Sequence, residues 1–247
     1  MNPEALTQLA RQLDGLSPAQ MLTWAAAKFP RQAALASSLG AEDQVLLDMS
    51  VKGGLLTKDP KLDLFTLDTG RLFPETIDLL AQSELHYAVQ FRVLYPDTAE
   101  VETMVASAGI NLFRRSPEDR HRCCGVRKVA PLRRALQGKA IWIVGLRSDQ
   151  TANRADLAPL VWDEANRLLK LSPLLQWSDA EVDAYLDEHQ VPRNPLHAQG
   201  YPSIGCAPCT RAIVPGEDPR AGRWWWEQES QRECGLHLEN GRLVRNH

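Results

Sequence analysis

The chain has 247 residues and a formal net charge of −3, with 44% hydrophobic and 24% charged residues. These values are ordinary for a globular protein, and the length is enough for one sizeable α/β domain, or for one domain with an appendage. The small negative charge argues against a nucleic-acid binder, and no stretch approaches the roughly 20 apolar residues that cross a membrane. The N-terminus also lacks the apolar core of a signal peptide, so we expect a cytoplasmic protein.

Two helices are predicted at the start of the chain. Ser17 is the expected N-cap of the second, and Pro18 lies in its first turn. Strands and helices then alternate. The predicted strands are 33–37, 62–67, 88–94, 140–145 and an extended run at 167–174, and the predicted helices are 41–51, 74–85, 98–109 and 178–190. This alternation implies parallel βαβ units, so we expect an α/β fold with a doubly wound, mostly parallel sheet.

The C-terminal end breaks this alternation and is rich in Gly, Pro, Arg and Trp. It predicts an irregular tail that runs over the surface of the domain. We therefore divide the chain into an α/β domain over residues 1–216 and a mobile tail over residues 217–247. Trp224, Trp225 and Trp226 could dock a partner protein or clamp the tail, and we expect at least one of them to pack as core.

Four loops directly follow predicted strands, and ligands of such sheets bind beyond the carboxyl ends of the strands. The loops read "SSLGAED", "LDTGRLFPET", "LYPDT" and "GLRSDQTANR", and we expect them to converge on one rim. In the first loop, Ser37, Ser38 and Gly40 precede a helix N-terminus. Hydroxyls, a glycine and a helix N-terminus together suit an anion, although an ordinary N-cap would also explain them.

Two other rim loops add candidate ligand-binding residues. Asp68 and Thr69 end a predicted strand, and Gly70 and Arg71 could reach a ligand from there. Arg147 follows another strand, and a guanidinium group can fork onto phosphate or sulfate oxygens. A solvated surface position is the alternative for Arg147.

The five cysteines fall into two pairs and a single residue: Cys123 with Cys124, Cys206 with Cys209, and Cys234. Structural disulfides are rare in the cytoplasm, so grouped cysteines indicate metal or redox chemistry. A [4Fe–4S] cluster takes four thiolates, whereas zinc favours cysteines two to four residues apart and suits the adjacent pair less well. Buried packing is one alternative. A redox disulfide between Cys206 and Cys209 is another, but it leaves the adjacent pair unexplained.

Basic residues surround the adjacent cysteines, with eight basic and two acidic residues between positions 114 and 134. If a helix runs through this segment, Lys128 lies on the same face as Cys124 and could stand between a cluster and an anionic substrate. Cys234 lies in the tail between Arg232 and His237. Cations lower the pKa of a thiol and so activate it, although an incidental exposed thiol would look the same.

Seven segments together resemble the assimilatory sulfonucleotide reductases, and among them the iron–sulfur adenosine 5′-phosphosulfate (APS) reductases. The matching segments are "SSLGAED", "LDTGRLFPET", "CCGVRK", "GLRSDQ", "GCAPCT", "GRWWWE" and "ECGLH". They extend from residue 37 to residue 237 in the family's order. The resemblance implies an adenine-nucleotide α-hydrolase fold, like that of the ATP pyrophosphatases. ATP-cleaving relatives usually read S-G-G-x-D-S in the first loop, where this chain reads "SLGAED".

The resemblance also implies the chemistry. The Cys234 thiolate attacks the sulfate sulfur of APS, AMP leaves, and reduced thioredoxin releases sulfite from the resulting S-sulfocysteine. Cations must mask the negative charges that meet in this step, and the candidates are Lys128 and Arg147 from the domain and Arg220 and Arg223 from the tail. His237 would tune Cys234 or orient the substrate. The four paired cysteines would hold a [4Fe–4S] cluster with structural and electrostatic roles.

Three alternatives stay open at this point. The first is a reductase of 3′-phosphoadenosine 5′-phosphosulfate (PAPS). The second is a zinc-binding, nucleotide-dependent protein that modifies tRNA, and the third is a non-catalytic iron–sulfur module. The sequence also allows a homo-oligomer and does not choose the thioredoxin partner.

Overall fold

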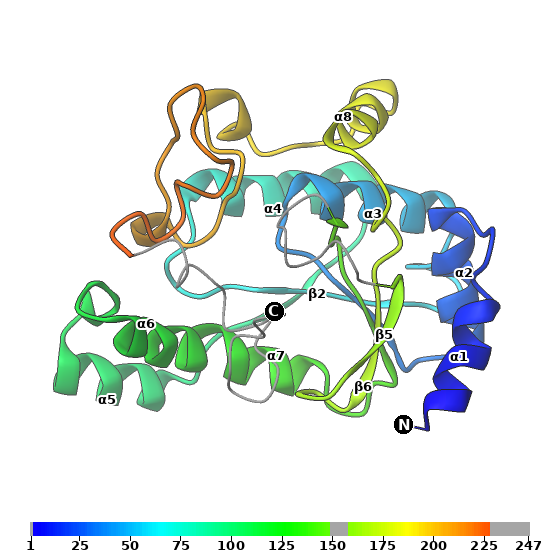
Figure 1. Ribbon diagram of the computed structural model, residues 1–247, viewed down its shortest axis with the longest axis horizontal. Helices are drawn as coiled ribbons and strands as arrows, with labels where there is room; N and C mark the ends of the chain where they lie inside the picture. Colours follow the sequence, from blue (N-terminus) through cyan, green and yellow to red (C-terminus); the bar gives the residue numbers. More distant parts are fainter. Residues whose placement is uncertain (1, 149–157, 228–247) are drawn as a thin grey trace.

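The computed structural model describes residues 2–148 and 158–227, which form an α/β fold around one sheet (Figure 1). Within these residues the sheet has six strands in the order β3-β2-β1-β4-β6-β5. The strands are β1 (Ala33–Ala36), β2 (Asp63–Leu67), β3 (Arg92–Leu94), β4 (Ile141–Ile143), β5 (Leu160–Asp163) and β6 (Leu168–Leu171). Neighbouring strands are parallel except for the β5–β6 pair. The predicted doubly wound, mostly parallel sheet is confirmed.

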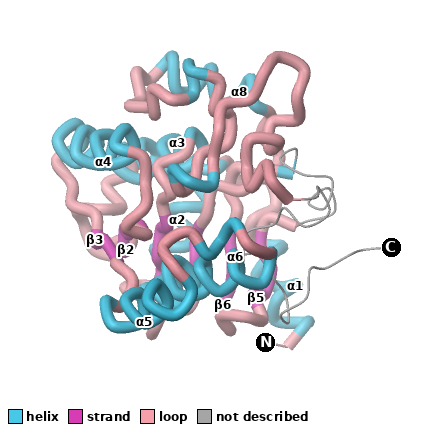
Figure 2. Tube along the Cα trace, turned by 90° about the vertical axis from the view of Figure 1, so that its left-hand side faces the viewer, coloured by secondary structure: helices cyan, strands magenta, loops and turns pink. Residues whose placement is uncertain are grey.

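Helices cover both faces of the sheet. They are α1 (Pro3–Arg11), α2 (Pro18–Lys28), α3 (Ala41–Lys52), α4 (Pro74–Tyr87), α5 (Thr98–Ala108), α6 (Pro117–Cys124), α7 (Ala130–Ala135) and α8 (Asp179–Glu188). Figure 2 shows the strands between a layer that contains α3 and α4 and a layer that contains α5 and α6. A π-helical turn, Gly125–Val129, joins α6 to α7, so one continuous helical segment follows the adjacent cysteines.

The central strands are apolar because both of their faces are buried. In β1, Ala33 and Leu35 pack in the core on the α2 and α3 side, whereas Ala34 packs in the core on the α7 side. In β4, Ile141 and Trp142 divide between the two cores in the same way. Successive side chains of a strand point to opposite faces, so a parallel sheet covered on both sides needs continuous apolar runs. The runs "AALAS" and "AIWIVG" meet that need.

Several local predictions are confirmed, and four elements differ: β3 is shorter than predicted, and β5, α6 and α7 were not among the predicted elements. Ser17 caps α2 in a capping box with Gln20, and Gly109 ends α5 with a φ of 80°. The third strand is shorter than predicted, because α4 continues to Tyr87 and Ala88 turns the chain in a left-handed conformation. Sequence analysis did not identify β5, an antiparallel edge strand that a short turn connects to β6.

The order of the strands reverses beside β1, whose neighbours are β2 and β4. In open α/β sheets the crevice at such a switch point is where ligands bind. The side chain of Asp43 joins the loops after β1 and β4 there, because its Oδ1 accepts from the Gly145 N–H at 3.1 Å and its Oδ2 accepts from the Ser38 N–H at 2.5 Å. The convergence expected from the sequence is confirmed for these two loops.

The first residues of the predicted tail pack against the domain. Trp224 is 1% exposed, and its N–H donates to the carbonyl of Cys209 at 3.1 Å. It shares a third hydrophobic core with Phe113 and Cys123, so the expectation that one tryptophan of the run packs as core is confirmed. Residues 228–247 lie outside the described part of the chain, and mobility of the tail stays a prediction.

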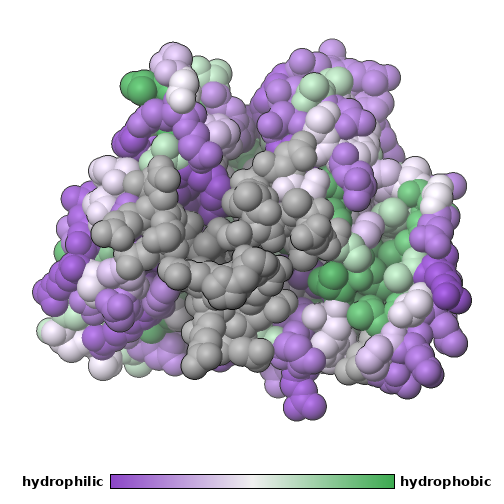
Figure 3. Space-filling view, in the orientation of Figure 1, coloured by the Kyte–Doolittle hydropathy of each residue, from purple (hydrophilic) through white to green (hydrophobic). Residues whose placement is uncertain are grey.

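The face of the molecule drawn in Figure 3 is largely polar. Hydrophilic residues cover most of the coloured surface in Figure 3. No helix in the described part of the chain is long and apolar enough to cross a membrane.

A buried ion pair fastens residue 227 to α6, and its removal provides a test of this packing. The Arg120 Nε and Glu227 Oε1 atoms lie 2.7 Å apart, and the two side chains are 0% and 3% exposed. We expect Glu227→Ala to lower the free energy of unfolding by about 3 kcal/mol, because the charge of Arg120 stays buried without this partner. Urea unfolding followed by far-UV circular dichroism measures the change.

The control is Asp187→Asn, which breaks an ion pair with Arg193 whose side chains are 65% and 42% exposed. Its cost should stay below about 1 kcal/mol. Equal losses in the two variants would contradict the role of burial.

Candidate active site

The two cysteine pairs converge on one pocket. Cys123 and Cys124 end α6, and Cys206 and Cys209 lie on a 3₁₀ turn that is distant in the sequence. The pocket is lined by Arg71, Phe113, Arg120, Cys123, Cys124, Arg127, Lys128, Cys206, Pro208 and Cys209. None of these four cysteines forms a disulfide, so no such bond links Cys206 to Cys209. The two pairs that sequence analysis grouped thus line the same pocket, and their role as cluster ligands stays a prediction.

The four cysteines that line the pocket equal in number the thiolates that a [4Fe–4S] cluster takes. Within the described residues, no three Cys, His, Asp or Glu side chains lie close enough together to hold one metal ion. A zinc ion binds each thiolate sulfur at a Zn–S distance of about 2.3 Å. In an iron–sulfur cluster each thiolate binds a different iron atom, so the sulfurs lie farther apart. Burial raises the pKa of the Cys123 thiol, and it raises that of Cys209 to about 12. These sulfurs therefore need a positive partner before they become thiolates.

Cations next to the pocket partly supply that positive charge. Arg127 is buried and donates from Nη1 to the carbonyl of Thr69 at 2.7 Å. Its charge and hydrogen bond act against burial and lower the pKa of Cys123. The charges of Lys128 and Arg223 lower the pKa of Cys209 in the same way. Lys128 thus lines the cysteine pocket, and its expected place between a cluster and the substrate stays a prediction.

The loop after β2 braces this pocket. Thr69 is 1% exposed, and its Oγ1 is hydrogen-bonded to Cys206 Sγ at 3.2 Å. Asp68 Oδ1 accepts from the N–H of Gly70 at 2.7 Å. The guanidinium of Arg71 donates to the carbonyl of Ile110 at 2.7 Å and stacks over the ring of Phe113. Thr69 and Arg71 thus contact residues that surround the cysteine pocket.

The loop after β1 is held from below by α3. Both the N–H and the hydroxyl of Ser38 donate to Asp43 Oδ2, at 2.5 and 2.7 Å. The hydroxyl of Ser37 accepts from the N–H of Leu39 at 3.1 Å. Gly40 is the N-cap of α3 and carries no side chain to cap it. The N–H groups of the first turn of α3 lack helical partners, as at any helix N-terminus.

Arg147 joins the N-terminal ends of α3 and α8. Its Nε lies 2.8 Å from Glu42 Oε1, and its Nη2 is paired with Asp179. Nη1 donates to the carbonyl of Trp177 at 3.3 Å. The residue is 4% exposed, so the alternative of a solvated surface arginine is wrong. Its candidate role in anion binding stays a prediction.

The tail residues divide into two groups. Arg223 is buried, donates to Ser203 at 3.3 Å and stacks on Trp224. A Cβ added at Gly205 would lie 2.3 Å from the Arg223 guanidinium, so a larger residue there would displace that side chain. Arg220 is half-buried, and its N–H donates to Asp218 at 2.7 Å. Cys234 and His237 lie outside the described residues.

Sequence reasoning did not single out Asp43 or Arg127 as site residues. Arg127 was only one of eight basic neighbours, and Asp43 looked like an ordinary first-turn acid. Asp43 lies in the first turn of the helix that follows the serine loop. This position, close to the carboxyl end of a strand, was the signal that could have identified it.

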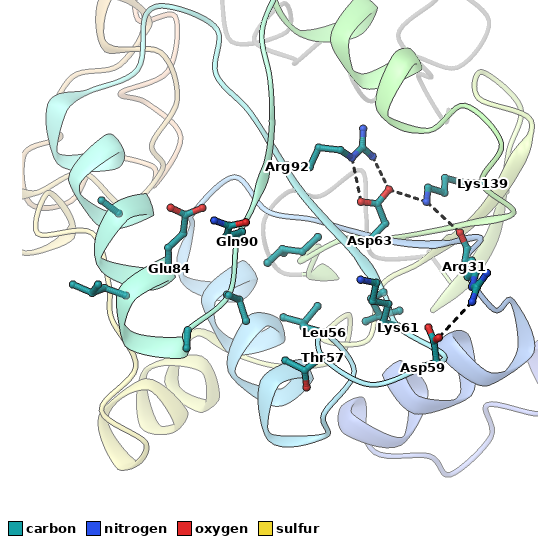
Figure 4. A pocket seen from close by; sticks show the side chains of 16 residues that line it. Arg31, Leu56, Thr57, Asp59, Lys61, Asp63, Glu84, Gln90, Arg92 and Lys139 are labelled. Carbon is teal, nitrogen blue, oxygen red and sulfur yellow. Dashed lines mark hydrogen bonds and ion pairs between the residues drawn. The ribbon is translucent and has the colours of Figure 1, made fainter.

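A broad pocket of about 1320 Å³ lies at the opposite edge of the sheet (Figure 4). Its polar lining includes Asp63, which Arg92 and Lys139 approach to 2.6 and 2.7 Å. These residues stand at or before the starts of β2, β3 and β4, whereas the four candidate loops follow the strand ends. The pocket contains none of the candidate site residues, so its size does not make it the active site.

The sequence comparisons agree with this geometry. Residues 32–212 match the phosphoadenosine phosphosulfate reductase domain family. The chain is 45% identical over 234 residues to the adenosine 5′-phosphosulfate reductase of Allochromatium vinosum, covering 95% of this chain and 83% of that protein. It is 45% identical over 226 residues to the corresponding enzyme of Agrobacterium fabrum, covering 92% of this chain and 85% of that protein. The chain belongs to the adenosine 5′-phosphosulfate reductases of this family.

Solved structures place the same family on this fold. The PAPS reductase of Candida auris is 30% identical with a TM-score of 0.72, over 86% of this chain and 98% of that one. An FMN adenylyltransferase of Candida glabrata is 16% identical with a TM-score of 0.55, over 98% of this chain and 83% of that one, and shares the fold alone. The expected adenine-nucleotide α-hydrolase-like fold is confirmed.

The turn between β2 and the cysteine pocket requires glycine at position 70, where φ is 69°. A Cβ there would lie 3.3 Å from Arg127 Nη1. We expect Gly70→Ala to cost about 1–2 kcal/mol for the left-handed conformation, plus the cost of displacing Arg127. Urea unfolding measures the total.

Gly138→Ala is the matched control, because Gly138 has a φ of 74° and nothing within 4 Å of an added Cβ. The difference between the two variants isolates the contact with Arg127. If both variants lose the same stability, that contact contributes nothing.

Proposed function

We propose that the protein reduces APS to sulfite and AMP, with a cysteine S-sulfonate on Cys234 as intermediate and thioredoxin as reductant. The observation that carries the proposal is the convergence of Cys123, Cys124, Cys206 and Cys209 with Lys128 on one pocket. The names of the curated bacterial relatives favour APS over PAPS as the substrate. The more distant Candida auris structure carries the PAPS name.

The four paired cysteines are proposed to hold a [4Fe–4S] cluster. When bound, the cluster would supply a fixed charge and a link between α6 and the 206–209 turn. Arg127 and Lys128 offset the negative charge that accumulates where four thiolates meet, and Thr69 hydrogen-bonds one of the sulfurs. Arg127 and Lys128 thus offset the charge of the cysteine thiolates, and Thr69 orients the Cys206 sulfur.

The reaction needs a thiolate to approach a sulfonate that is itself negative. The Cys234 sulfur forms a bond to the sulfate sulfur, the sulfur–oxygen bond to phosphate breaks, and AMP leaves with the bonding electron pair. AMP is a stable anion, so no strong general acid is required. Lys128 and Arg223, which lie beside the pocket, are the best-placed described cations to mask the repulsion. Arg147, Arg220 and His237 are further candidates.

The second half of the cycle restores the enzyme. One thioredoxin thiolate attacks the Cys234 sulfur, and sulfite leaves with the bonding pair. The second thioredoxin thiol attacks the mixed disulfide, so thioredoxin ends as a disulfide and Cys234 returns as a thiolate. The dithiol supplies both electrons, which lets the cluster keep one oxidation state. A cytoplasmic location suits this reduced partner.

Intact mass spectrometry after incubation with APS tests the substrate, the nucleophile and the partner together. We expect one added SO₃ mass per chain, because the S-sulfonate persists until a second thiol attacks it. Reduced thioredoxin should remove the adduct and release sulfite.

The matched control is Cys234→Ser, which should form no adduct. An adduct on that variant would assign the nucleophile elsewhere. Faster adduct formation from PAPS than from APS would reverse the choice of substrate.

The metal content tests the cluster separately. Anaerobically purified protein should contain iron and acid-labile sulfide in equal amounts. Cys206→Ser should lower both strongly, since a serine hydroxyl is a poor replacement for a thiolate ligand.

Cys234→Ser should keep the iron and sulfide of the unchanged chain. Colourless protein with zinc in place of iron would overturn the cluster and favour the zinc-binding alternative.

A further inference from the structure

We infer that Asp43 is a positioning residue for the substrate, because it holds the serine loop after β1 in the shape that receives an anionic group. The inference rests on the proposed function. Asp43 does not touch the substrate in this role. It acts through the loop of residues 37–40 and the end of β4.

Three hydrogen bonds converge on the Asp43 carboxylate. Ser38 donates its N–H and its hydroxyl to Oδ2, and Gly145 donates its N–H to Oδ1. The two donors follow β1 and β4, the strands between which the sheet order reverses. One side chain of α3 therefore connects the two loops that border the ligand crevice.

Gly145, which follows β4, lies too close to Asp43 to carry a side chain. A Cβ on Gly145 would lie 2.4 Å from Asp43 Oδ1 and 2.8 Å from the Cβ of Glu42. Such an approach excludes alanine without displacement of the carboxylate. The glycine in "GLRSDQ" is thus explained by Asp43.

The loop itself adopts a conformation that needs support. Leu39 has a φ of 63° although it carries a side chain, and it is 2% exposed. A left-handed residue of this kind costs about 1–2 kcal/mol. Ser38 directly before it is fixed by Asp43, and Ser37 bonds the Leu39 N–H. These contacts turn the backbone into the N-terminus of α3.

The hydrogen bonds change the role of Ser38. Both of its donors point to Asp43, so they shape the loop instead of binding an anion. The N–H groups in the first turn of α3 are then the groups left to meet an anion from this loop. Burial raises the pKa of Asp43 to about 6 against the pull of Ser38, and Glu42, which itself pairs with Arg147, adds to the rise.

The test compares Asp43→Asn with Asp48→Asn in steady-state reduction of APS. The asparagine at position 43 keeps the size but turns an amide NH₂ toward groups that already donate. We expect KM for APS to rise about tenfold with kcat changed less than about threefold, because the loop loses its shape before chemistry begins. Direct binding of AMP to the same variant should weaken by a similar factor.

Asp48 is a matched control. It is a 3% exposed carboxylate on the same helix, and it accepts hydrogen bonds from Tyr87 at 3.2 Å and Tyr185 at 2.6 Å. Asp48→Asn should lower stability without changing KM. Equal KM values in the two variants would overturn the inference.

Two further variants keep the inference testable if Asp43→Asn does not fold. Gly145→Ala should displace the carboxylate and raise KM, and Ser38→Ala should do so more weakly, because it removes one donor. If both variants fold and keep the KM of the unchanged chain, Asp43 does not position the loop. Failure of the unchanged chain to form sulfite from APS would instead refute the proposed function.

Discussion

The parallel pairing of β1 with β2 on one side and β4 on the other determines where the candidate site residues lie. Parallel strands deliver their following loops to the same edge of a sheet, and the order reverses beside β1. The serine loop, the loop that carries Thr69 and the loop that carries Gly145 therefore share one rim. The chemistry depends on this pairing, because none of these segments is adjacent to another in the sequence.

The cysteine pocket depends on a second constraint, the burial of charge at the end of α6. Arg120 and Arg127 are almost fully buried, and each has a specific oxygen partner, in Glu227 and in the carbonyl of Thr69. Buried charges are tolerated only when they are paired, so these partners fix the positions of both side chains. Electrostatic interactions are stronger away from water, and the nearby thiols therefore respond to Arg127 and Lys128.

The sequence predicted the features that local pattern controls. The strands around residues 33 and 141 and the cap of α2 follow from short stretches of chain. The roles of Thr69 and Arg147 could not be read in this way. Thr69 meets a sulfur that comes from residue 206, and Arg147 is buried by Glu42 and Asp179 from two different helices. Only tertiary packing decides such contacts, and the described residues do not reach Cys234.

The end of β2 links the two parts of the site. Asp68 closes the turn by accepting from the Gly70 N–H, while the carbonyl of Thr69 accepts from Arg127 and its hydroxyl is hydrogen-bonded to Cys206. Thr69 therefore connects the end of β2 to the cysteine pocket, and the sheet fixes the position of that pocket relative to the loops that follow the strands. A rigid link of this kind suits the proposed reaction, in which the Cys234 thiolate would meet a sulfonate between positively charged side chains from both parts of the site.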